Sequence, residues 1–180
     1  MDERLPRARG GDVRAFTSLL REHDAAMRAL VWSVVRDAWL MDDVLQTAYE
    51  KAWRNLETFR GEASFRTWLH RICYTTAVDA LRQEARRRHD RLADHEDRAA
   101  ATSGPATTTI RRLEWDRAWS GLSPDQRAAV VLVVVEGLSY EEAARVCGSR
   151  PGTIASRVGR ARERLRAVLG EDARPTEEQG

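Results

Sequence analysis

Apolar residues recur every three or four positions along most of the chain, which is the spacing of one buried face of an α-helix. The first such stretch starts after Asp12, a residue type that caps helix starts, and runs to Val35. A second apolar face follows in MDDVLQTAYEKAWRNL, and a third follows Ser64 in FRTWLHRICYTTAVDAL. The pattern therefore predicts three packed helices in the first half of the chain.

The periodicity stops at residues 92–109, where the sequence is LADHEDRAAATSGPATTT. Small and polar residues with an interior glycine and proline are typical of a flexible tether. This linker divides the chain into a first unit at residues 10–91 and a second unit at residues 110–170. The acidic tail at residues 171–180 has too few apolar residues to pack, so we expect it to be disordered.

The second unit begins with apolar residues at helical spacing from Ile110 to Leu122, which predict a helix, and continues in AAVVLVVV. Valine-rich runs have the composition of a strand. However, Ser123 is followed by proline and, three positions on, by Gln126, which is the spacing of a helix capping box. Gly137 then offers a natural end. We therefore predict a helix here.

The stretch from Leu138 to Leu169 predicts two short helices around a tight turn. Ser139 and Glu142 have the spacing of a second capping box, and Gly148 can end the helix that they begin. The next helix can start at Pro151, because proline needs no amide partner in a first turn. Two helices arranged in this way are typical of a helix-turn-helix, whose second helix enters the major groove of DNA.

That second helix carries a polar face beside its apolar stripe. Guanidinium groups on such a face can fork onto a guanine edge or hold a phosphate. We therefore predict contacts with duplex DNA at a set of small polar and arginine residues: Arg150, Thr153, Ser156, Arg157, Arg160 and Arg164. The alternative interpretation is a solvated arginine face on an ordinary helical hairpin.

In the first unit, Phe59, Trp68 and Tyr74 lie among arginines, and the third predicted helix ends in a basic run from Arg82 to Arg91. Bases stack on aromatic rings while cations hold the backbone phosphates, so this combination suits single-stranded nucleic acid. Core packing of the rings and a solvated helix end are the alternatives.

The start of the second predicted helix is acidic, with Asp42, Asp43, Gln46 and Glu50 on its polar side. Acids near a helix start interact favourably with the helix dipole, so capping and solvation are one explanation. The other is a docking surface for a basic partner, which charge alone does not decide.

Composition narrows the classes of function. The formal net charge of +2 hides local clustering, because the many arginines between residues 145 and 166 face a single acid, Glu163. No apolar run is long enough for a membrane span or a signal peptide, so we expect a cytoplasmic protein without membrane insertion. Cys73 and Cys147 form no ligand pattern, and no catalytic signature is present; we expect no enzyme activity, metal or cofactor.

The order of these segments resembles the extracytoplasmic-function sigma factors of bacteria. The likeness covers nearly the whole chain and depends on a combination of motifs: FRGEASFRTWLHRI, SPDQRAAVVLVVVEGLSYEEAA and GTIASRVGRARERLR. The resemblance implies an all-α protein of two small helical domains joined by a flexible linker, the C-terminal one a helix-turn-helix. It also implies core RNA polymerase, promoter DNA and an anti-sigma factor as partners, and a monomer when free.

The resemblance also implies a role for individual residues. The polymerase-binding residues would be Asp42, Asp43, Gln46, Thr47, Glu50 and Trp53. The residues for single-stranded DNA at the minus-ten element would be Phe59, Arg60, Ser64, Phe65, Trp68, Arg71, Tyr74, Thr75 and Arg82. Gly152 joins the predicted duplex-binding set, which would read the minus-thirty-five element.

Four residues depart from those usual in the family, namely Thr47, Tyr74, Thr75 and Ala155. The promoter sequence is therefore not expected to copy that of relatives. A stand-alone helix-turn-helix regulator is the rival interpretation. It explains the second unit equally well and predicts duplex binding without polymerase, but it gives no role to the acidic helix and the aromatic loop.

Overall fold

The computed structural model describes residues 3–93 and 110–169, and throughout these ranges the regular structure is helical. The elements in chain order are α1 (Arg4–Arg9), α2 (Val13–Val35), α3 (Ala38–Arg54), a 3-10 turn η1 (Leu56–Thr58), α4 (Phe65–Ala93), α5 (Ile110–Ser120), α6 (Pro124–Val130), a π-helical segment η2 (Val131–Val135), α7 (Tyr140–Cys147) and α8 (Pro151–Leu169). The predicted all-α class with a C-terminal helix-turn-helix is confirmed. Residues 94–109 of the predicted linker and the predicted tail lie outside the described ranges.

The helices begin where the sequence predicts because side chains satisfy their free amides. Asp12 Oδ1 accepts a hydrogen bond from the Ala15 amide at 3.0 Å, which caps α2. Both predicted capping boxes are present, one from Ser123 at the start of α6 and one from Ser139 at the start of α7. Each box satisfies two amides that would otherwise lack a partner, so these starts are fixed locally.

The valine-rich run is helical, as predicted, but its second half has a wider, π-helical turn. The Glu136 amide donates to the Val131 carbonyl, five residues back, at 2.9 Å. The capping box had predicted an ordinary helix here, and the wide turn is a finding that the sequence pattern did not anticipate. Within this segment Val131 and Leu132 are buried, whereas Val134 and Val135 are exposed.

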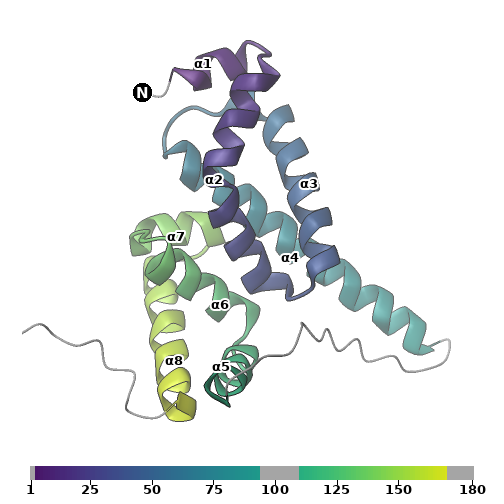
Figure 1. Cartoon of the computed structure of the whole chain (residues 1–180), viewed down its shortest axis with the longest axis vertical. Helices are drawn as coiled ribbons and strands as arrows, with labels where there is room; N and C mark the ends of the chain where they lie inside the picture. Colours follow the sequence, from purple (N-terminus) through teal and green to yellow (C-terminus); the bar gives the residue numbers. More distant parts are fainter. Residues whose placement is uncertain (1–2, 94–109, 170–180) are drawn as a thin grey trace, which may run out of the picture.

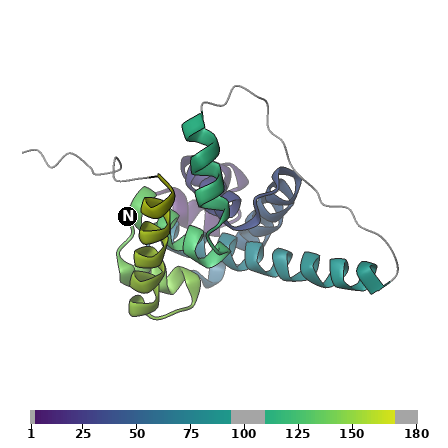
Figure 2. The same ribbon diagram turned by 90° about the horizontal axis from the view of Figure 1, so that it is seen from below.

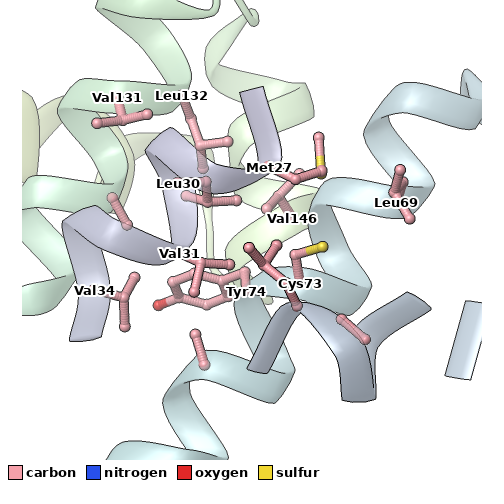
Figure 3. Close-up of a cluster of buried hydrophobic side chains, with 14 of the residues drawn as sticks. Met27, Leu30, Val31, Val34, Leu69, Cys73, Tyr74, Val131, Leu132 and Val146 are labelled. Atoms are coloured by element: carbon pink, nitrogen blue, oxygen red, sulfur yellow. The ribbon is translucent and has the colours of Figure 1, made fainter. Parts of the chain in front are cut away.

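The two units pack against each other through one continuous hydrophobic core. Helices α2 and α4 of the first unit contact α6, η2 and α7 of the second (Figure 1). In the close-up, Met27, Leu30 and Val31 of α2 lie beside Leu132 of η2 and Val146 of α7 (Figure 3). All five side chains are almost completely buried. The units are therefore docked in this structure rather than held apart.

Two elements extend away from this core. The C-terminal end of α4 projects beyond the other helices, as two perpendicular views show (Figures 1 and 2). Helix α5 packs against α8 on the far side of the second unit (Figure 2). Within the described ranges, no helix combines the length and the apolar character that crossing a bilayer requires.

The shared core generates a test of stability. Leu132 is fully buried between the units, whereas Val134, two residues further on, is 52% exposed. We expect Leu132→Ala to lower the free energy of unfolding by about 2–5 kcal/mol, because it removes apolar contacts and leaves a cavity. Val134→Ala is the matched control, with an expected change of about 0.5 kcal/mol or less. Urea denaturation followed by circular dichroism measures both, and equal losses would contradict the described packing.

His70 makes stability depend on pH. It is fully buried, its Nδ1 lies 2.8 Å from the Arg66 carbonyl oxygen, and its Nε2 has no hydrogen-bond partner among the described residues. Burial lowers the pKa of His70 below its ordinary value, because a charged ring would lose its hydration. The unfolded chain therefore binds this proton more readily than the folded chain.

We expect the free energy of unfolding to fall as the pH drops through the unfolded histidine value of about 6.5. Above that value both states hold a neutral ring, and the penalty disappears. Urea denaturation at about pH 7.5 and about pH 5.5 measures the difference. In the His70→Gln variant the difference should shrink, since the amide does not titrate. If His70→Gln keeps the full wild-type difference in the free energy of unfolding between the two pH values, other titrating groups cause that difference.

Candidate nucleic-acid interface

Helix α8 presents one apolar and one polar face, as its sequence predicts. Ile154, Val158 and Ala161 are buried against the other helices of the second unit. The residues predicted to bind duplex DNA that are exposed in the structure are Arg150, Gly152, Thr153, Ser156, Arg160 and Arg164. Arg160 Nη2 donates to Ser156 Oγ at 2.6 Å, so these two side chains lie together on the polar face. This surface therefore presents exposed hydrogen-bond donors of the kind that read base edges in a major groove.

Arg157 is the exception within the predicted set. Only 22% of its side chain is exposed, and its Nη2 forms an ion pair with the Asp125 carboxylate at the start of α6. Its Nη1 is buried without a hydrogen-bond partner among the described residues. In this arrangement the guanidinium is turned toward its own unit and is not presented to a base edge.

The same carboxylate contacts the first unit. The Tyr74 hydroxyl donates to Asp125 Oδ1 at 2.9 Å, while Arg157 binds Oδ2. Burial raises the pKa of Tyr74 well above its ordinary value, so the hydroxyl keeps its proton and remains a donor. Tyr74 was predicted to contact a single strand and Arg157 to contact a duplex; in this arrangement both bind Asp125.

The aromatic residues predicted for single-stranded DNA form a packed cluster. The Phe59 and Trp68 ring centroids are 5.2 Å apart, and those of Phe65 and Trp68 are 5.6 Å apart. Phe59 is buried, and the Arg9 guanidinium of α1 lies over its ring, 5.6 Å from the centroid. Core packing, the alternative interpretation, therefore accounts for Phe59, whereas Phe65 and Trp68 are only half-buried.

A cavity of about 280 Å³ lies beside this cluster. Its walls come from the loop at residues 58–63, from Thr67, Trp68 and Arg71 of α4, and from Arg145 of α7. Arg60 and Arg71, both predicted to bind single-stranded DNA, are exposed around it. An aromatic ring with arginines at its edge is a site where a nucleobase can stack while its phosphate is held.

The remaining residues of the predicted single-strand set have local roles. Ser64 Oγ accepts from the Thr67 amide at 3.1 Å and so caps α4. Thr75 Oγ1 donates to the Arg71 carbonyl at 2.9 Å, within the same helix. Arg82 is exposed on the projecting part of α4 and lies 3.6 Å from Asp79. Of these three, Arg82 leaves the most surface for a phosphate.

The acidic face of α3 is exposed at Asp42, Asp43, Gln46 and Glu50. Asp42 is partly neutralised, because Arg28 Nη1 donates to its Oδ1 at 2.9 Å. The other two predicted docking residues are half-buried; one is Thr47, and the other, Trp53, packs its ring against Phe16 with centroids 5.0 Å apart. The polar part of the predicted docking face is therefore accessible, whereas Trp53 contributes mainly to the core.

Two further polar contacts between the units were not anticipated from the sequence. Arg127 of α6 is buried and donates to the Ser33 and Val34 carbonyls at the end of α2. Its charge faces the negative end of that helix, and burial lowers its pKa. Arg66 of α4 donates to the Glu136 carbonyl at 2.8 Å and pairs with its carboxylate. The one signal in the sequence was that Arg127 directly precedes the apolar run AAVVLVVV.

Metal binding and thiol reactivity depend on how the His, Cys, Asp and Glu side chains of the described ranges are placed and protonated. No group of three or more His, Cys, Asp or Glu side chains there is arranged to hold a metal ion. Burial raises the pKa of the Cys73 thiol to about 12 and that of Cys147 to about 11. Both cysteines are free, and at neutral pH both are protonated and unreactive.

Comparison with protein families matches two segments of the chain. The model described as sigma-70 region 2 matches residues 19–87, and the model described as sigma-70, region 4 matches residues 112–165. The first match covers most of α2, all of α3 and most of α4, and the second covers α5 to α8 apart from their outer ends. The two matches thus fall on the two units in chain order.

Several curated proteins are similar along most of their length. RNA polymerase sigma-H factor of Pseudomonas aeruginosa is 35% identical over 176 residues, covering 92% of this chain and 91% of that protein. ECF RNA polymerase sigma factor SigM of Mycobacterium tuberculosis is 36% identical over 160 residues, with coverage of 89% and 80%. ECF RNA polymerase sigma-E factor of Escherichia coli is 34% identical, with coverage of 89% and 90%.

Two solved structures share the fold. The sigma factor RpoE of Bartonella quintana, in complex with the anti-sigma factor NepR, superposes with a TM-score of 0.73 at 31% identity, covering 89% of this chain and 99% of that one. CnrH, in complex with the cytosolic domain of CnrY, gives a TM-score of 0.66 at 28% identity, with coverage of 94% and 97%. The likeness therefore extends over both units.

Proposed function

Because this chain belongs to the extracytoplasmic-function sigma factors of the sigma-70 family, we propose that it directs core RNA polymerase to promoters through a minus-thirty-five and a minus-ten element and promotes DNA melting. The observation that carries the proposal is the pair of family matches, one on each unit, in a chain similar to initiation factors along nearly its whole length. The protein acts by binding and catalyses no reaction itself.

The polar face of α8 reads the duplex element. Its exposed residues include Arg150, Thr153 and Arg160, and the first turns of a second helix are where helix-turn-helix proteins meet base edges. Arg157 joins them after its guanidinium leaves Asp125. A single reading helix binds weakly alone, so the duplex contact depends on being held beside polymerase, where effective concentration replaces intrinsic affinity.

The cavity beside Trp68 captures bases of the melted strand. Flipping a base out of a duplex costs a few kcal/mol, and stacking on an aromatic ring with phosphate contacts offsets that cost. Trp68 is half-buried and lines the cavity, and Arg60 and Arg71 stand at its edge. Melting is thus driven by capture of the exposed strand, without an energy-consuming step in the protein.

The acidic face of α3 docks on core polymerase. Asp43, Gln46 and Glu50 are exposed together on one side of the helix, which suits a basic partner surface.

We propose that the protein is a monomer in the cytoplasm when free. One structural neighbour was solved with an anti-sigma factor, so we propose a partner of that class here as well.

The docked arrangement of the units has to open for this function. Asp125 forms an ion pair with Arg157 and accepts a hydrogen bond from the Tyr74 hydroxyl, and Arg145 of the second unit lines the cavity beside Trp68. We propose that polymerase, by binding the two units separately, pulls them apart and exposes both DNA-binding surfaces. In the absence of polymerase, the chain with its two units docked is then expected to bind promoters weakly.

A run-off assay tests the function directly. The purified chain is added to core polymerase with a pool of genomic fragments from its source, and the 5′ ends of the transcripts are sequenced. We expect new transcripts that share sequence near the minus-thirty-five and minus-ten positions. Arg157→Ala should lower their yield by about tenfold or more, since it removes a groove contact.

Polymerase binding, measured by co-elution with the core enzyme, is the control and should be unchanged by Arg157→Ala. Equal losses of transcription and co-elution would contradict the assigned role of Arg157. A stand-alone regulator would bind duplex fragments yet give no run-off product, and that result would overturn the proposed function.

The release of Arg157 from Asp125 is tested with Asp125→Asn. The substitution removes the charge that holds Arg157 and weakens the acceptor of the Tyr74 hydroxyl. We expect the free chain to bind the minus-thirty-five duplex up to about fivefold more tightly than the wild type does, since a part-exposed ion pair is worth about 1 kcal/mol or less. Fluorescence anisotropy with the duplex found in the run-off assay measures this.

Glu163→Gln is the matched control, because it makes the same change of charge at an exposed position on α8. It should raise affinity for promoter and scrambled duplexes alike and only slightly. If Asp125→Asn gains no more than Glu163→Gln, the ion pair with Arg157 does not limit duplex binding.

A further inference from the structure

The cavity beside Trp68 is completed by both units. Its aromatic wall, Phe59 and Trp68, belongs to the first unit together with Arg60 and Arg71, but Arg145 comes from α7 of the second. Arg71 and Arg145 also line a second hollow, which continues past the turn at Gly148 between α7 and α8. These two guanidinium groups therefore stand between two adjoining hollows while the units are docked.

The arginines around this space are not neutralised by acids. Within the described residues, Arg60, Arg71 and Arg145 form no ion pair, whereas Arg28, Arg66 and Arg157 elsewhere each pair with a carboxylate. Glu62 lines the first hollow and Glu141 the second, so the acids there are outnumbered. Guanidinium groups that face a cavity without a counter-ion favour an anionic ligand with planar oxygen groups, of which phosphate is the common example.

The wall of the cavity formed by Trp68 favours a flat aromatic group on the ligand. Trp68 is half-buried and lines the cavity, whose volume of about 280 Å³ is near the lower end for small-molecule sites. A flat heterocycle can stack on that ring, and a phosphate attached to it can reach the two arginines between the hollows. A ligand with both groups is a nucleotide.

We propose that the docked protein binds a free nucleoside monophosphate here, with its base against Trp68 and its phosphate between Arg71 and Arg145. This inference uses the wall that the proposed function assigns to melted bases, but it names a different occupant and adds Arg145, which contributes only while the units are docked. A ligand that contacts both units stabilises their docked arrangement. By linkage, the nucleotide and the promoter oppose one another.

The experiment is calorimetric titration of the full-length chain with the four deoxynucleoside 5′-monophosphates, the matching nucleosides and inorganic phosphate. We expect saturable binding of at least one monophosphate. Its nucleoside and phosphate alone should each bind about tenfold more weakly or worse, because each keeps only one of the two sets of contacts. Absence of binding at millimolar concentration, or equal binding of nucleoside and monophosphate, would overturn the proposal.

Arg145→Ala tests whether the monophosphate binds at this site or only through non-specific attraction to a basic surface. We expect it to weaken binding of the monophosphate by about fivefold or more, because a charge-assisted hydrogen bond to the phosphate is lost. Arg162→Ala, the same change at an exposed position of α8, should leave binding unchanged. Equal effects of the two variants, or no effect of Arg145→Ala, would show that the second unit does not complete the site.

Two further measurements distinguish this inference from the proposed function. Run-off transcription should be unchanged by Arg145→Ala. Loss of nucleotide binding together with a normal run-off product would therefore support the site. If the wild-type chain binds the nucleotide but gives no run-off product, only the proposed function is contradicted. A single-stranded oligodeoxynucleotide should lose little affinity in Arg145→Ala. If it loses as much as the monophosphate, the cavity serves the promoter strand alone and the inference fails.

Discussion

The structure depends on one apolar contact, in which α2 and α4 of the first unit share a core with η2 and α7 of the second. Burying a side chain such as Leu30 or Leu132 is worth about 1.5–3 kcal/mol, and several are buried together here. The ion pair of Asp125 with Arg157 is part-exposed and is worth about 1 kcal/mol or less. Apolar burial therefore holds the units together, and the polar contacts determine how they fit.

Arg127 shows how the polar contacts determine that fit. Helix α2 ends at Val35 with carbonyls that have no partner inside the helix, and the buried guanidinium donates to two of them. A buried cation usually needs a carboxylate, but a helix C-terminus carries partial negative charge. If the second unit slid along the first by one turn, the two carbonyls would be buried without partners and Arg127 would keep only its contact with the Leu122 carbonyl of its own unit. That cost selects one register from the many that apolar surfaces alone would allow.

Local structure could be predicted from sequence because its causes lie within a few residues of one another. Asp12, Ser123 and Ser139 cap the helices that their spacing predicts, and the stripe from Ile154 to Ala161 faces the core. The docking of the units could not be predicted, since its partners are far apart in sequence and follow no period. For the same reason Tyr74 and Arg157, each chosen from its local pattern, gave no sign that they share one carboxylate. The π-helical turn was missed because ordinary capping signals frame it on both sides.

The balance of these forces bears on how such a protein is switched on. Breaking the contact between Asp125 and Arg157 would free one side chain but leave the shared core intact, so a charge change alone opens the chain only slightly. A partner that separates the units has to replace the burial of Met27, Leu30 and Leu132 with contacts of its own, and it shifts the equilibrium only by the difference in its affinity for the two arrangements. A large assembly that binds both units at separate places meets this requirement, whereas a short duplex bound by α8 does not. Under the proposed function, this packing is the reason to expect that promoter recognition depends on polymerase.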